Sequence, residues 1–250
     1  MNATTMRDWL TARPVAHRGL HDAAAGVIEN TPSAFHAAIA GNYAIECDVQ
    51  IAADGEALVY HDDALGRLTE GTAPLATTSS AELKRVPFKA TADRMLTLGE
   101  LCELVAGQVT LLVEIKSRYD GDLRLATRAT KVLASYKGPV AVMSFDPQPI
   151  AVAKELAPAL TRGLVAQRRD QAARSDHDTT GAHGMNYARH ALAARPQFLA
   201  YRVKDLPSAV PLFAHGLMRL PLLTWTVRTP ADQARAARWA DQIIFEGFRP

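Results

Sequence analysis

Short apolar runs that are typical of β-strands alternate along the whole chain with longer amphipathic stretches that are typical of α-helices. The runs that predict strands cover residues 14–18, 43–49, 57–61, 110–116, 139–145, 161–166, 198–203, 222–227 and 242–246. The stretches that predict helices cover residues 32–40, 98–106, 123–136, 147–156, 206–215 and 230–239. Alternation of this kind indicates βαβ units and an α/β fold with a parallel sheet.

Several helix ends carry their own signals. A cap residue is followed by proline at Thr31-Pro32, Asp146-Pro147 and Thr229-Pro230, and proline at the first position favours a helix start. Gly41 and Gly216 stand where a glycine that ends a helix is expected.

The number of predicted strands exceeds what a closed barrel needs by one. The gap between residues 49 and 57 is too short for a crossover helix, and Asp54-Gly55 within it is a strong hairpin signal. Residues 43–61 are therefore expected to form a hairpin or a strand with a return excursion. An open doubly wound sheet fits less well, because no glycine-rich phosphate loop follows the first strand. We expect a single, distorted (β/α)8 barrel of the TIM type.

Two long segments interrupt the alternation. Residues 62–94 form an excursion after the third predicted strand, with a helix signal at residues 79–84, and residues 167–196 are polar and rich in arginine. In a barrel, both would be βα loops over the catalytic face. The second is expected to be a solvated surface loop or a segment that closes over the substrate. We expect residues 1–250 to form one catalytic domain, as α/β barrels of about 250 residues usually do.

Composition and charge exclude some classes of function but do not indicate a particular one. Hydrophobic residues make up 48% of the chain and charged residues 22%, which are ordinary globular values. The formal net charge of +2 is too small to indicate a nucleic-acid partner. The N-terminal residues do not resemble a signal peptide, and no run reaches the roughly 20 apolar residues of a membrane-spanning helix. We expect a cytoplasmic protein without an integral membrane segment.

Ionisable residues gather where the predicted strands end. They are His17 and Arg18 on the first strand, Glu46 and Asp48 on the second, His61 on the third, and Glu114 and Lys116 on the fourth. Parallel strands of a barrel present their carboxyl ends on one face, which is where barrel enzymes place their active sites. Scattered surface charges would not repeatedly fall at strand ends, so these residues are candidates for chemistry.

Three of these residues are carboxylates that would converge. Glu46 and Asp48 are two positions apart in a strand, so their side chains point to the same side. Taken alone, this pair is also compatible with a solvated outer face. Together with Glu114 it would place three mutually repelling carboxylates in a barrel interior, a conflict that a divalent cation resolves. All-oxygen ligands favour Mg²⁺, Ca²⁺ or Mn²⁺ over Zn²⁺.

The remaining candidates suit phosphoryl transfer. His17 and His61 could act as general base and general acid across a bound substrate, although a histidine can also be an ordinary core residue. Arg18 and Lys116 could bind an anionic group or simply pair with neighbouring carboxylates. Cationic groups with paired histidines are typical of sites that stabilise charge and protonate a leaving group.

These residues belong to a series of motifs spread over almost the whole chain. In order, they are Ala16-His17-Arg18-Gly19, Glu29-Asn30-Thr31-Pro32, Ile45-Glu46-Cys47-Asp48-Val49, Asp54-Gly55, Val59-Tyr60-His61-Asp62, residues 67–71, Glu114-Ile115-Lys116, Ser144-Phe145-Asp146-Pro147 and Trp225-Thr226-Val227. The series resembles the glycerophosphodiester phosphodiesterase family. None of the motifs is specific alone, but their common order is.

The resemblance implies a metal-dependent enzyme on a distorted TIM barrel that hydrolyses a small-molecule glycerophosphodiester to an alcohol and glycerol 3-phosphate. In that family the glycerol hydroxyl is thought to attack phosphorus first, and water then opens the cyclic phosphate. The resemblance assigns the metal to Glu46, Asp48 and Glu114, and acid–base catalysis to His17 and His61. It assigns the phosphate to Arg18 and Lys116.

Other positions are assigned less directly. The same resemblance implies that Glu29 either contacts the substrate or supports the residues that contact it. Phe145 and Trp225, which end predicted strands, could form an apolar wall against the glycerol or leaving alcohol, or pack in the core. Glu246 stands where many family members have an aspartate, so its role is open. A lysophospholipase D acting on a lipid-bearing diester, or a catalytically silent phosphodiester-binding barrel, are the alternative functions.

Overall fold

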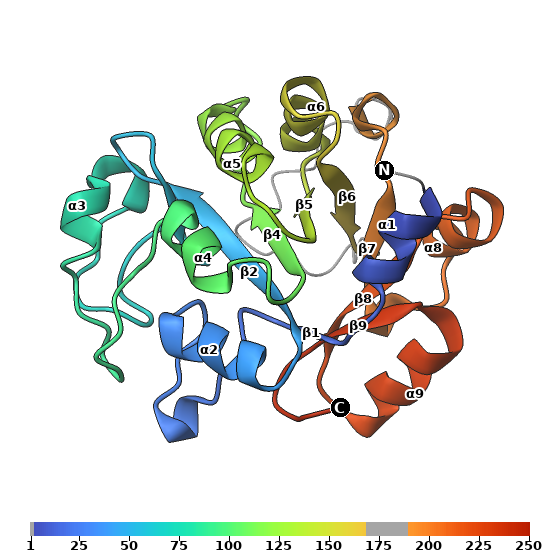
Figure 1. The fold of residues 1–250 in the computed structure, drawn as a ribbon, viewed down its shortest axis with the longest axis horizontal. Helices are drawn as coiled ribbons and strands as arrows, with labels where there is room; N and C mark the ends of the chain where they lie inside the picture. The colour runs from blue at the N-terminus through green and yellow to red at the C-terminus, as the bar shows by residue number, and fades with distance from the viewer. Residues whose placement is uncertain (1–2, 169–189) are drawn as a thin grey trace.

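The computed structural model describes residues 3–168 and 190–250, and within them parallel strands form a closed barrel (Figure 1). The barrel strands are β1 (Val15–Ala16), β2 (Ala44–Ile51), β4 (Leu111–Ile115), β5 (Val140–Ser144), β6 (Thr161–Ala166), β7 (Phe198–Arg202), β8 (Leu222–Val227) and β9 (Gln242–Phe245). Each pairs in parallel with the next, and β1 pairs with both β2 and β9, which closes the ring. The expected (β/α)8 barrel is confirmed.

The extra strand is the return arm of the expected hairpin. Strand β3 (Ala57–Val59) pairs antiparallel with β2, and the turn between them contains Gly55 at φ 81°. A left-handed φ is the conformation that glycine adopts without steric cost. The backbone N–H of Tyr60 donates to the carbonyl of Asp48 at 3.0 Å. The return arm therefore brings the next residue, His61, back beside the end of β2.

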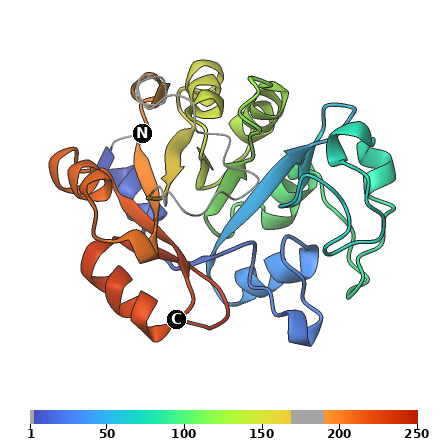
Figure 2. The same cartoon turned by 180° about the vertical axis from the view of Figure 1, so that it is seen from behind.

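Helices surround the barrel (Figures 1 and 2). The longer ones are α2 (Pro32–Ala40), α4 (Leu98–Val105), α5 (Arg124–Ala134), α6 (Pro147–Leu156) and α9 (Pro230–Trp239). Their starts agree with the sequence signals: the side chain of Asp146 accepts the N–H of Gln148, and Thr229 accepts that of Asp232 in a capping box. Thr31 precedes α2 without a side-chain cap bond.

The expected helix over residues 206–215 is wrong. The chain instead forms a 3₁₀ turn, η3 (Val203–Asp205), then the short helix α8 (Ala209–Leu212) and a wide helical turn, η4 (Phe213–Leu217). Pro211 lacks the N–H that a helix starting at residue 206 would need at that position, whereas in α8 it lies in the first turn, where no N–H is needed. Gly216 lies inside η4 rather than after a helix, so its expected role is also wrong, whereas Gly41 does end α2.

Strand alternation separates two hydrophobic layers. On β2, Ile45, Cys47 and Val49 belong to the large cluster beneath the outer helices, whereas Ala44 belongs to an inner cluster. The inner cluster contains the inward residues near the amino ends of the strands: Val15, Ala44, Leu112, Ala141, Phe198, Ala200, Leu223 and Ile244. Helix α1 (Ala3–Leu10), which the apolar pattern did not predict, adds Met6 and Leu10 to this cluster. The amino-terminal end of the barrel is therefore closed by an apolar plug.

The excursion after β3 has its own hydrophobic cluster. It contains η2 (Leu75–Thr77) and α3 (Ser80–Leu83), and it packs Leu75, Leu83, Phe88 and Met95 against Leu58 and Tyr60. Residues 169–189, which make up most of the second long segment, lie outside the described residues. Within residues 3–168 and 190–250, no helix is long and apolar enough to cross a membrane.

Candidate active site

Three buried carboxylates lie at the carboxyl end of the barrel. Glu46 and Asp48 on β2 are each 1% exposed, and Asp48 is in register with Glu114 on β4. One oxygen from each of the three lies within 4.8 Å of the others. Oε1 of Glu46 is buried without a hydrogen-bond partner. Burial, together with the charges of Asp48 and Glu114, raises the pKa of Glu46 well above its usual range.

Two basic side chains neutralise part of this cluster. Lys116 Nζ lies 2.7 Å from Asp48 Oδ1 and also contacts Glu114 Oε1. Arg18 Nε lies 3.1 Å from Asp48 Oδ2. Burial alone would raise the pKa of Asp48, but Lys116 and Arg18 outweigh it and hold the pKa below its usual range. Both groups that were expected to bind phosphate are thus placed beside the carboxylates as countercharges.

Asn30 orients Asp48, a role that the strand pattern does not predict. Its Nδ2 donates to Asp48 Oδ2 at 2.9 Å, and the backbone N–H of Asp48 donates to its Oδ1 at 3.3 Å. Asn30 is 1% exposed and has φ 56°. Asparagine tolerates this left-handed conformation better than most residues. Its position directly after Glu29 in a loop was the available signal.

His17 is held by the far end of the chain. Because β1 pairs with β9, His17 Nδ1 lies 2.8 Å from Oε2 of Glu246, which also accepts Nη2 of Arg228 at 3.0 Å. Burial raises the pKa of Glu246, but His17 and Arg228 outweigh it and lower the pKa to about 2. A charged carboxylate only accepts hydrogen bonds, so His17 Nδ1 carries a proton, and the neutral ring keeps its lone pair on Nε2. Burial lowers the pKa of His17 despite this bond.

His61 is held in the same way by its neighbour. Its Nδ1 lies 2.7 Å from Oδ1 of Asp62, whose Oδ2 accepts Nε of Arg67 at 2.7 Å. Burial lowers the pKa of His61 as well. Each histidine is therefore bound by a carboxylate that is itself bound by an arginine. Neither Asp62 nor Arg67 had been assigned a role.

Glu29 links Arg18, which lies beside Asp48, to Arg67, which binds Asp62. Its Oε1 accepts Nη1 of Arg18 at 2.7 Å and Nη2 of Arg67 at 2.7 Å. Burial would raise the pKa of Glu29, but the two guanidinium groups outweigh it and lower the pKa. These contacts suit a residue that positions two arginines.

Phe145 and Trp225 form an edge-to-face pair with ring centroids 5.4 Å apart. Both pack on the inner cluster and are partly exposed. Trp225 Nε1 donates to the carbonyl of Ala200 at 3.2 Å, which fixes its ring. The pair thus caps the apolar interior where the charged mouth begins.

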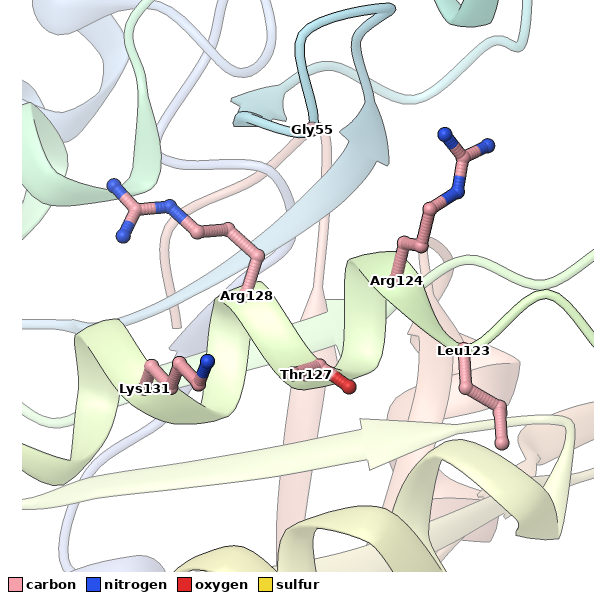
Figure 3. Close-up of a pocket in the computed structure, with 6 residues that line it drawn as sticks. All are labelled: Gly55, Leu123, Arg124, Thr127, Arg128 and Lys131. Atoms are coloured by element: carbon pink, nitrogen blue, oxygen red, sulfur yellow. The ribbon is translucent and has the colours of Figure 1, made fainter.

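A hollow of about 580 Å³ lies outside the barrel, along α5 (Figure 3). It is lined by Gly55, Leu123, Arg124, Thr127, Arg128 and Lys131. Both of its guanidinium groups are already paired, that of Arg124 with Asp122 and that of Arg128 with Glu56. The hollow contains none of the candidate residues, so it is not the candidate site.

The residues at the carboxyl end of the barrel therefore indicate the class of protein. Catalytic groups of barrel enzymes lie at this end of the strands, and acid–base pairs beside a cation-binding cluster are typical of enzymes that cleave phosphate esters. Residues 17–246 match the model of the glycerophosphoryl diester phosphodiesterase family. The chain belongs to this family of phosphoric diester hydrolases.

Two relatives agree with this assignment, and a solved structure shows the same fold. A glycerophosphodiester phosphodiesterase of Caldanaerobacter subterraneus subsp. tengcongensis is 32% identical over 61% of this chain and 66% of its own length, just under two thirds. One of Bacillus subtilis is 25% identical over 94% of this chain and 83% of its own. A solved Oleispira antarctica phosphodiesterase, in complex with the product sn-glycerol-3-phosphate, has a TM-score of 0.76 at 20% identity, covering 95% of this chain and 94% of its own.

Proposed function

We propose that this chain hydrolyses glycerophosphodiesters to an alcohol and glycerol 3-phosphate, with a divalent cation held by Glu46, Asp48 and Glu114. The observation that carries the proposal is the cluster of these carboxylates between two carboxylate-bound histidines. The relatives named above support the substrate class.

The donor set fits a hard cation. Three carboxylates within one ion's reach match the ligands that Mg²⁺, Ca²⁺ and Mn²⁺ prefer. The unpartnered Oε1 of Glu46 is a buried acceptor that such an ion would satisfy. When bound, the ion would stabilise negative charge on the phosphoryl group. It would also relieve the repulsion from Asp48 and Glu114, which adds to burial in raising the pKa of Glu46.

The side chains of the chain itself supply the rest of the chemistry. An ion bound to the carboxylates would weaken the ion pairs of Lys116 and Arg18 with Asp48. We propose that these two side chains then bind the substrate phosphate. His17 and His61 are each held at Nδ1, which leaves Nε2 for proton transfer. The neutral ring of the pair can take the proton of the attacking hydroxyl at Nε2, and the other ring, when protonated on both nitrogens, can protonate the leaving alcohol from Nε2. Phe145 and Trp225 would provide an apolar surface for the carbon skeleton.

Release of glycerol 3-phosphate from glycerophosphocholine tests the proposal. The EDTA-treated protein is expected to be inactive, and added Mg²⁺, Ca²⁺ or Mn²⁺ to restore turnover. Undiminished activity after chelation would contradict the cation site. Measuring a lysophospholipid in parallel shows whether the preferred diester carries a lipid chain.

Variants separate the cation from the histidines. Glu46→Gln is expected to lose cation binding and activity together, because it removes a charged ligand. His17→Ala and His61→Ala are expected to lose about 10²–10⁴-fold in kcat while calorimetry still detects the cation. Tight diester binding without turnover by the wild-type protein would instead favour a silent barrel.

A further inference from the structure

Beside the carboxylate cluster lies a second group of metal-ligand side chains, formed by His17, His21 and Glu246. One ligand atom from each of these residues lies within 4.8 Å of the others. His17 Nδ1 is 2.8 Å and His21 Nε2 is 4.0 Å from the same oxygen, Oε2 of Glu246. Two imidazoles and a carboxylate are a donor set that binds Zn²⁺ in enzymes.

His21 has no other task in the described structure that accounts for its position. Its Nε2 is buried and has no hydrogen-bond partner there. The backbone on both sides is fixed, because the N–H of Leu20 donates to Ala34 at 3.0 Å and that of Asp22 to Val27 at 2.9 Å. A buried ring nitrogen without a partner is costly, and here it is held near the oxygen that binds His17.

The distances suit a small tetrahedral ion. Zinc–ligand bonds of about 2.0–2.1 Å in tetrahedral geometry separate ligand atoms by roughly 3.3 Å. The two distances to Glu246 Oε2, 2.8 and 4.0 Å, lie on either side of that value. Side-chain shifts of about 0.5 Å for His17 and about 0.7 Å for His21 would therefore bring both rings to that spacing from Glu246, and the ion would take the place of the proton that His17 donates to Glu246.

We propose that His17, His21 and Glu246 bind a transition-metal ion such as Zn²⁺, and that the bound ion inhibits the enzyme. A histidine whose Nδ1 holds a metal in place of the proton is fixed as a ligand, and its Nε2 loses the basicity and freedom that proton transfer requires. The inhibition, though not the binding, rests on the proposed function.

The two neighbouring sites would select different ions. The all-oxygen cluster favours hard cations, whereas imidazole ligands favour zinc, copper and nickel. Arg228 contacts Glu246 and opposes a second positive charge there, but its side chain is 54% exposed. It would turn toward solvent on binding, so the affinity should fall short of that of a preformed structural zinc site.

Zinc binding is measured directly, by competition with a chromophoric chelator, with Mg²⁺ in excess to fill the carboxylate cluster. His21→Gln and His21→Phe remove the ligand nitrogen, and His21→Phe also keeps the volume of a ring. His36→Gln, at an exposed histidine on α2, is the matched control. Wild type and His36→Gln should bind zinc with equal affinity, and the His21 variants at least ten-fold more weakly. Loss of a group that only supports a metal ligand already lowers metal affinity by about 10- to 100-fold.

Activity is then measured at rising zinc concentration with the same Mg²⁺ excess. Zinc should inhibit wild type and His36→Gln, while each folded His21 variant needs at least ten-fold more zinc for the same inhibition and matches wild type without zinc. Equal zinc affinity or equal inhibition in the His21 variants would overturn the proposal. If zinc binding depends on His21 but no variant turns over a diester, the metal site stands and the proposed function fails.

Discussion

The contacts of Glu246 predict how much stability its charge contributes. His17 and Arg228 lower the pKa of Glu246 from 4.5 to about 2. At about 1.4 kcal/mol for each pH unit, the native structure favours the charged carboxylate by about 3 kcal/mol. Because Arg228 is half exposed, solvent screens part of its contribution. We therefore expect Glu246→Gln to lower the free energy of unfolding by about 1–2 kcal/mol at neutral pH.

The loss should depend on pH in a defined direction. Since the pKa of Glu246 is lower in the native than in the unfolded state, its stabilising effect is complete above about pH 4.5 and disappears toward about pH 2. Urea unfolding of wild type and Glu246→Gln measures the difference. It should stay constant between about pH 7 and pH 5.5 and shrink below that range. Glu70→Gln, at an exposed glutamate, is the control.

Two results would refute this reasoning. One is a Glu246→Gln variant that is no less stable at neutral pH than Glu70→Gln. The other is a difference that does not shrink in acid. Turnover provides an independent test of positioning, because the amide no longer holds the Nδ1 proton of His17 with a full charge. We expect kcat to fall by about 10- to 1000-fold, within the share of a general acid or base, with KM little changed and partial rescue in Glu246→Asp.

Three further substitutions test the supports of the site, each by urea unfolding. Asn30→Ala should cost about 1–3 kcal/mol, because it removes the hydrogen bonds to Oδ2 and to the backbone N–H of buried Asp48, and should also weaken cation binding by calorimetry. Leu10→Ala, in the apolar plug, should cost about 2–5 kcal/mol with little effect on KM. Gly19→Ala should cost about 1–3 kcal/mol, because φ is 79° and the added Cβ would lie 2.8 Å from a side chain of α2. Gly121→Ala, at φ 81° with open space around it, should cost less.

The barrel and the convergence of its charged residues could be predicted because both follow from local pattern. Side chains two apart on a strand share a face, and parallel strands end on one side. That reasoning was enough to bring Glu46 and Asp48 together with Glu114. Such a pattern assigns roles only to residues that lie on or at the end of a predicted strand. It could not assign a role to Asn30, which acts from a loop through a left-handed backbone conformation.

Contacts that depend on how strands distant in the sequence pair with each other could not be predicted from local pattern either. His17 and Glu246 lie 229 positions apart, and their hydrogen bond depends on how β1 pairs with β9. Helix α1 was missed because it has only 8 residues. Its buried residues, Met6 and Leu10, have helical spacing, but two positions are too few to establish a period. The helix expected over residues 206–215 was wrong because apolar periodicity was given more weight than Pro211, which would lie in its interior.

The two histidines owe their positions to different parts of the fold. His61 is bound by the adjacent Asp62, so its hydrogen bond needs only the hairpin that returns from β2. His17 depends on the closing pair of strands, since Glu246 directly follows β9. Barrel closure therefore does more than complete a core. It supplies the carboxylate that binds one of the two histidines proposed to be catalytic, and any loosening of β9 should disturb His17 before His61.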